Sequence, residues 1–92
     1  MELTAEISMY PLHEDYEPPI LDFIERLRKN PNVQVSTNAM STQVTGPYDV
    51  VHELLRQEMR TSFARYGKAI MVVKFIPGAL PIFDPPITNT KQ

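Results

Sequence analysis

The sequence contains no cysteine among its 92 residues. It therefore has no disulfide framework, no thiolate nucleophile and no cysteine-ligated metal, and this composition suits a reducing compartment. Long hydrophobic runs are also absent, because the longest, from Ala69 to Val73, is far too short to span a bilayer. The start Met1-Glu2-Leu3 has neither the positive charge nor the apolar stretch of a leader. We therefore expect a cytoplasmic protein.

An excess of positive charge is missing as well. Nine Lys and Arg residues against eleven Asp and Glu residues give a formal net charge of −2, without the basic footprint of proteins that bind nucleic acid or anionic membranes. Hydrophobic residues at 42% and charged residues at 22% are ordinary for a globular domain. A chain of this length builds one modest core, and association often stabilises such domains, so we expect an oligomer.

Hydrophobic periodicity predicts six elements. The residues from Thr4 to Leu12 alternate as in a strand, with Leu3, Ala5, Ile7 and Met9 on one face and Thr4, Glu6, Ser8 and Tyr10 on the other. The remaining elements are a helix opening at Glu17-Pro18-Pro19 and ending at Asn30, a strand at 33–37, a strand at 40–45, a helix from Pro47 to a left-handed cap at Gly67, and a strand at 68–76. The link Asn38-Ala39 is short enough for a hairpin.

This order of elements predicts an α+β, ferredoxin-like βαββαβ fold, with a four-stranded antiparallel sheet and both helices on one face. The domain should occupy residues 1–78. The last strand carries a continuous apolar run at 70–73, which indicates burial on both faces. We therefore expect the sheet face away from the helices to be covered by a second subunit, giving a homodimer or homotetramer through the sheet.

Several faces of these elements carry further expectations. In the first helix, a solvated face should hold Asp22, Glu25, Arg26, Arg28 and Lys29. In the second helix, a buried stripe should hold Val51, Leu55, Met59, Ser62, Phe63 and Tyr66. The methionines at positions 9, 40, 59 and 71 should fill the core. The proline-rich tail, residues 79–92, should dock its apolar part at 79–87 on its own domain or a neighbouring subunit, while 89–92 fray.

The topology brings polar side chains together at one end of the sheet, where the first strand ends and the hairpin turns. These candidate ligand-binding residues are Ser8, Tyr10, Thr37, Asn38, Ser41 and Thr42. Thr42 shares strand parity with Val44, and Thr37 with Val35, so both polar side chains should face the core. The alternative is that their hydroxyls merely bond neighbouring backbone, since threonine is in any case a good strand residue.

Three segments carry a resemblance to a known family. Glu6-Ile7-Ser8-Met9-Tyr10-Pro11-Leu12, the hairpin end Ser41-Thr42-Gln43-Val44-Thr45-Gly46 and the strand Met71-Val72-Val73-Lys74-Phe75 resemble the YkoF-like thiamine-binding proteins. The resemblance implies a small ferredoxin-like domain that associates through its sheet and binds thiamine or its hydroxymethylpyrimidine part without catalysis. The hydroxyls, amides and aromatic ring of the candidate residues suit such a heteroaromatic ligand.

Other functions fit the residues less well. The loop His13-Glu14-Asp15 contains metal-ligand types, but His52 lies far from it, so we expect a solvated loop and no metal. The same acidic loop would repel the phosphate of an acylphosphatase, and only Tyr10 could stack on an RNA base. No nucleophile with an adjacent base emerges, so we expect no enzyme. The alternative is an assembly or regulatory module without vitamin binding.

Glu6 lies on the polar face of the first strand. It could receive a ligand amine or the thiazolium cation of thiamine. We favour instead a pair with Lys74, either across the sheet or across a subunit interface.

Overall fold

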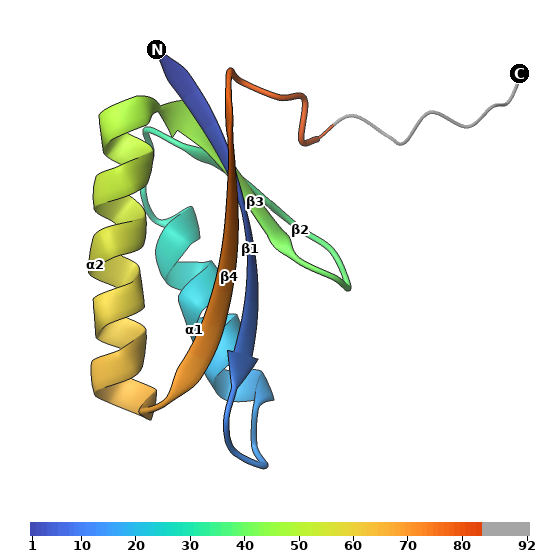
Figure 1. Ribbon diagram of the computed structural model, residues 1–92, viewed down its shortest axis with the longest axis vertical. Helices are drawn as coiled ribbons and strands as arrows, with labels where there is room; N and C mark the ends of the chain where they lie inside the picture. The colour runs from blue at the N-terminus through green and yellow to red at the C-terminus, as the bar shows by residue number, and fades with distance from the viewer. Residues whose placement is uncertain (84–92) are drawn as a thin grey trace, which may run out of the picture.

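The computed structural model describes residues 1–83 and has the expected α+β, ferredoxin-like architecture (Figure 1). Both helices cover one face of a four-stranded antiparallel sheet with strand order β2-β3-β1-β4. The elements are β1 (Glu2–Pro11), α1 (Glu17–Arg28), β2 (Gln34–Thr37), β3 (Thr42–Pro47), α2 (Tyr48–Tyr66) and β4 (Ala69–Pro77). Within residues 1–83, no helix is long and apolar enough to cross a membrane.

The alternation of β1 builds the core as the sequence predicts. Leu3, Ala5 and Ile7 are buried under the helices, and they pack with Phe23 and Leu27 of α1. From the other elements the core receives Val44, Val51, Leu54 and Leu55. Pro18 and Pro19 occupy the first turn of α1, where a missing backbone N–H costs nothing.

The buried stripe of α2 is only partly as predicted. Val51, Leu55 and Ser62 are buried, but Phe63 is 40% exposed. The cause is the position of the helix, because α2 packs mainly over β1 and β3 and leaves the helix side of β4 partly bare. Gly67 ends the helix at φ 85° and ψ −144°. The positive φ favours glycine, but the ψ value is not that of the left-handed cap we expected.

Arg26 does not lie on a solvated face, which corrects the sequence-based expectation. Its guanidinium bridges the helices: it donates to Asp22 Oδ2 at 3.1 Å, to Glu58 Oε1 at 2.7 Å and to Ser62 Oγ at 2.6 Å. Partial burial opposes ionisation of Asp22, but the charges of Arg26 and Arg65 outweigh it and hold the pKa of that carboxyl below its usual range. This network fixes α1 against α2.

The start of the tail is attached to the open face of the sheet. The Thr4 hydroxyl donates to the carbonyl O of Gly78 at 2.8 Å and accepts from the N–H of Leu80 at 3.0 Å. Thr4 also bonds Thr45 Oγ1 at 2.9 Å, and both threonines are buried. Phe83, in contrast, remains 61% exposed. The predicted docking of 84–87 and fraying of 89–92 fall outside the described residues.

Candidate ligand-binding site

All six candidate residues line one cavity of about 200 Å³ at the hairpin end of the sheet. Four of them come from the β2–β3 hairpin and two from the end of β1. The remaining lining residues are Ile7, Met9, Ile20, Phe23, Ile24, Ala39 and Met40. The topology therefore brings together residues as far apart in the chain as Ser8 and Thr42, as the sequence predicted.

The cavity exists because the hairpin leaves the sheet early. Pairing between β1 and β3 ends at Ile7 and Thr42, whereas pairing between β1 and β4 continues to Pro11 and Ala69. In Figure 1 the hairpin leans away from the end of β1. The N–H of Leu12 donates to the carbonyl of Lys68. The backbone N–H and C=O groups of the even-numbered residues of β1 therefore point toward β4. By the alternation of an antiparallel ladder, the N–H and C=O of Met9 face the gap.

The hairpin loop is longer than the two residues we expected. Its strands end at Thr37 and begin again at Thr42, and the Asn38 N–H donates to the Ser41 carbonyl at 3.0 Å. The side chain of Asn38 explains the longer turn, because its Oδ1 accepts from the N–H groups of Met40 and Ser41. Met40 therefore lies in the loop and is 84% exposed, so the expectation that it fills the core was wrong.

Thr42 and Thr37 form a hydroxyl pair at the floor of the hairpin. They are opposite each other in the register, and Thr42 is only 5% exposed although Thr37 is exposed. The Thr37 hydroxyl donates to the Ser41 carbonyl at 3.3 Å, so Thr42 donates the 2.9 Å bond between the two hydroxyls. The alternative that a threonine hydroxyl merely bonds the neighbouring backbone is therefore correct for Thr37. The oxygen of Thr42 keeps lone pairs that can accept from a ligand.

Ser41 belongs to a second network on the open face of the sheet. Its hydroxyl donates to Glu6 Oε2 at 2.7 Å and accepts from Gln43 Nε2 at 2.8 Å. The other oxygen of Glu6 lies 3.8 Å from Lys74 Nζ, which confirms the predicted pair across the sheet. Ser41 therefore holds the hairpin to β1 and has less capacity left for a ligand.

Ser8 and Tyr10 border the cavity from β1, but strand parity turns their side chains toward the open face of the sheet, and Tyr10 is half exposed. The polar groups of β1 that face the gap are therefore the backbone N–H and C=O of Met9. Ile20 and Ile24 of α1 supply an apolar wall that the sequence-based site did not include. Ile20 and Ile24 recur at helical spacing on the apolar side of α1, and only the folded structure shows that they also border the cavity. No group of three His, Asp or Glu side chains in the described part of the chain could hold a metal ion.

Comparison with known proteins identifies related sequences and folds. Residues 2–78 match the model of the YKOF-related Family. None of the curated proteins compared with the chain is significantly similar to it.

Several solved structures share the fold, among them the following three. Protein SP2199 from Streptococcus pneumoniae has a TM-score of 0.79 at 17% identity, over 87% of this chain and 90% of that chain. The hypothetical protein MJ1052 from Methanocaldococcus jannaschii has a TM-score of 0.73 at 22% identity, over 98% and 90%. The protein TM0486 from Thermotoga maritima, named as a candidate thiamine biosynthesis/salvage protein, has a TM-score of 0.77 at 16% identity, over 89% and 91%.

Proposed function

Because this chain belongs to the YKOF-related family, we propose that it binds thiamine, or the hydroxymethylpyrimidine part of thiamine, without catalysing a reaction. The observation that carries the proposal is the single cavity lined by all six polar residues of the hairpin end. The fold shared with the Thermotoga maritima protein supports the same ligand class.

The chemistry of the cavity suits the pyrimidine ring. Ile24 and Met9 offer apolar contacts for a flat ring, and the backbone N–H and C=O of Met9 form a donor and acceptor pair near the hydroxyl of Thr42. An aminopyrimidine presents a matching amino donor beside ring acceptors. Pockets for drug-sized molecules measure roughly 300–1,000 Å³, so a cavity of about 200 Å³ fits one ring better than two.

The thiazolium cation would therefore remain outside the cavity. The loop that joins β1 to α1 begins at this end of the sheet and carries the exposed carboxylates of Glu14 and Asp15, and Glu17 adds a third in the first turn of α1. Their negative charge favours a cation nearby, although solvent and salt screen it.

Isothermal titration calorimetry tests the proposal. We expect the full chain to bind hydroxymethylpyrimidine and thiamine with one site per chain, and we expect added salt to weaken only the binding of cationic thiamine. Replacement of Thr42 by Val keeps the shape but removes the accepting oxygen, so the affinity should fall by about 1 kcal/mol, or roughly five-fold. If the Thr42→Val variant binds with the same affinity as the natural chain, Thr42 does not contact the ligand.

Thr45→Val is the matched control for that variant. Thr45 is a buried threonine of the same strand, but it bonds Thr4 at the opposite end of the sheet. Its replacement should leave the affinity unchanged. A chain that binds none of these ligands would contradict the proposal.

The second candidate is an assembly module, and the open sheet face favours it. Ile70, Val72 and Ile76 of β4 lie on this face and are each about half exposed. We propose that a second copy covers the face, giving a two-fold dimer or tetramer. A titration without heat, together with an oligomer in sedimentation velocity, would favour assembly alone.

A further inference from the structure

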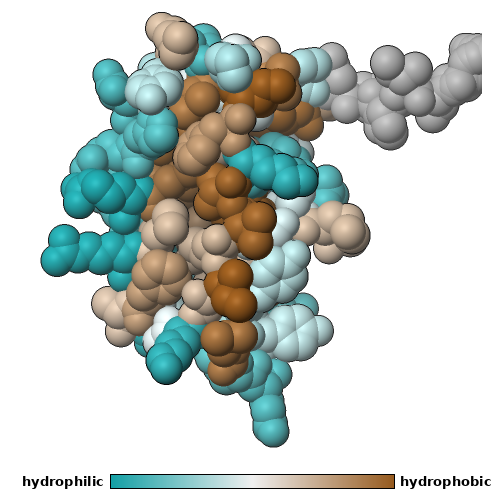
Figure 2. All heavy atoms as spheres, viewed as in Figure 1, coloured by the Kyte–Doolittle hydropathy of each residue, from teal (hydrophilic) through white to brown (hydrophobic). Residues whose placement is uncertain are grey.

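The two edges of the sheet differ in how well they are protected against pairing. The edge strand β2 has only four residues, which leaves little backbone for another strand to pair with. The opposite edge strand, β4, has nine residues, and hydrophobic side chains form a stripe over it (Figure 2). Charged side chains and prolines usually block such edges, but Lys74 pairs with Glu6 on the open face and Pro77 is the last residue of the strand.

The free backbone groups of β4 can be assigned from the ladder. The N–H of Leu12 donates to the carbonyl of Lys68, and the N–H of Gly78 donates to the carbonyl of Glu2. Even-numbered residues of β4 therefore bond to β1, and odd-numbered residues point their N–H and C=O away from the sheet. The free N–H groups belong to Ala69, Met71, Val73 and Phe75.

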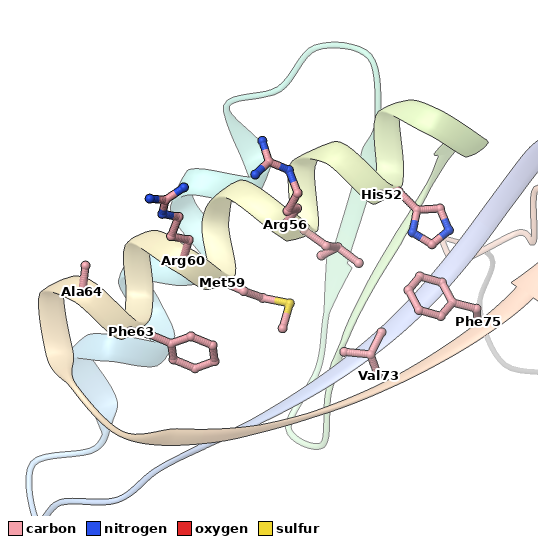
Figure 3. A pocket seen from close by; sticks show the side chains of 9 residues that line it. His52, Arg56, Met59, Arg60, Phe63, Ala64, Val73 and Phe75 are labelled. Atoms are coloured by element: carbon pink, nitrogen blue, oxygen red, sulfur yellow. The ribbon is translucent and has the colours of Figure 1, made fainter.

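A groove follows this edge on the helix side. It lies between α2 and β4 and has a volume of about 800 Å³. Figure 3 shows Met59 and Phe63 pointing from α2 toward β4, whereas Arg56 and Arg60 point away from the strand. Phe75 lies at one end, with its ring stacked on His52 at 4.9 Å, and is 47% exposed. Because the two cations point elsewhere, the groove offers an apolar wall beside an unpaired strand and does not suit an anion.

We propose that β4 pairs antiparallel with β4 of a second copy of this chain, so that the two sheets join into one. A two-fold axis normal to the sheet at Val72 would place Ala69 opposite the partner's Phe75, and Met71 opposite the partner's Val73. This register uses all four free N–H groups and leaves Pro77 outside the pairing. It also places Lys74 opposite the partner's Ile70, so that no like charges face each other.

Side-chain shape supports the same register. Ala69 is the smallest helix-side residue of β4, and it borders a second cavity of about 520 Å³ with Leu12, Phe63, Gly67 and Lys68. The partner's Phe75, opposite Ala69 and on the same face, would place its ring in this cavity. The two-fold axis repeats the arrangement, so the strand supplies a large side chain and a matching hollow to each copy.

Cysteine cross-linking tests the register, because the natural chain has no cysteine. Residues opposite each other in a non-hydrogen-bonded antiparallel pair lie about 4.5 Å apart at Cα, within the range for a disulfide. We expect the Val72→Cys variant to form a covalent dimer under mild oxidation. In this register Ile70 lies opposite the partner's Lys74, about four residues along the strand from the partner's Ile70. The Ile70→Cys variant, although on the same face, should therefore remain monomeric on a non-reducing gel.

Two further variants separate edge pairing from contact through the open sheet face. Val73→Pro removes one free N–H from each copy without touching the bonds to β1, so in the Val72→Cys background it should reduce cross-linking about thirty-fold. Val73→Ala keeps the N–H and should retain the cross-link. Cross-linking that survives Val73→Pro, or that never forms with Val72→Cys, would overturn the proposal.

A size swap provides a test that does not depend on proline. Ala69→Phe and Phe75→Ala should each weaken the cross-link of the Val72→Cys variant, and the double variant should restore it because it exchanges the large and small positions. If the two single variants and the double variant all cross-link to the same extent, the proposed register is wrong.

Discussion

At the scale of single residues, Arg26 joins the two helices. Its guanidinium donates to Glu58 and Ser62 of α2, which lie 32 and 36 positions away in the chain. A helical wheel assigns Arg26 to the polar side of α1, and no local pattern contains these distant partners. Strand parity needs no such partner, and the structure buries Thr42 as its parity predicted.

Arg26 should therefore contribute to stability. Arg26→Met keeps the apolar stem but removes the donors to Asp22, Glu58 and Ser62, and we expect it to lower the free energy of unfolding by about 2 kcal/mol. Arg28→Met changes an exposed residue of the same helix and should cost much less. Urea denaturation measures both, and equal midpoints for the two variants would contradict the account.

The same network predicts a pH dependence. The charges of Arg26 and Arg65 hold the pKa of Asp22 in the folded protein below 3.8, the ordinary value for an aspartate side chain. Its contribution to stability is therefore present above that value and is lost as the pH falls through the folded pKa. The stability difference between the natural chain and Asp22→Asn should shrink as the pH is lowered from about 6 to about 3. A difference that stays constant over this range would contradict the role of Asp22.

At the scale of elements, hydrophobic periodicity was sufficient to predict the order and type of all six helices and strands. Periodicity did not predict the length of the β2–β3 hairpin loop, because the side chain of Asn38 accepts from the N–H groups of Met40 and Ser41 in place of a strand partner. It also could not show that α2 leaves β4 partly uncovered, because that depends on where the helix packs. The apolar run at 70–73 was interpreted as a strand buried on both faces. In one chain it is a partly exposed edge.

The tail segment 79–83 gives a prediction at this scale. Deletion of residues 79–92 removes the Leu80 N–H bond to Thr4 and uncovers that buried hydroxyl, so the melting temperature should fall by roughly 4–8 °C for each 1 kcal/mol lost. Deletion of 89–92 alone, the part expected to fray, is the matched control and should leave the melting temperature nearly unchanged. If both truncated chains melt like the full chain, segment 79–83 does not stabilise the domain.

At the scale of the whole molecule, the fold separates two kinds of surface. The hairpin end carries the polar cavity, and the β4 edge with its groove carries the apolar surface suited to a second copy. Pairing at the edge and stacking through the open face use different two-fold axes. Both together would give a four-chain assembly in which the hairpin end of each chain lies away from the β4 edge.

The central claim is that the hairpin-end cavity binds the pyrimidine ring. The most direct test is to follow backbone amide signals by NMR while hydroxymethylpyrimidine is added to the full chain. The account predicts shifts that saturate and are confined to residues 7–10, 20–24 and 37–42, with Met9 among the largest. Shifts confined to His52, Phe63 and Phe75 of the α2–β4 groove, or no shifts at millimolar ligand, would contradict it.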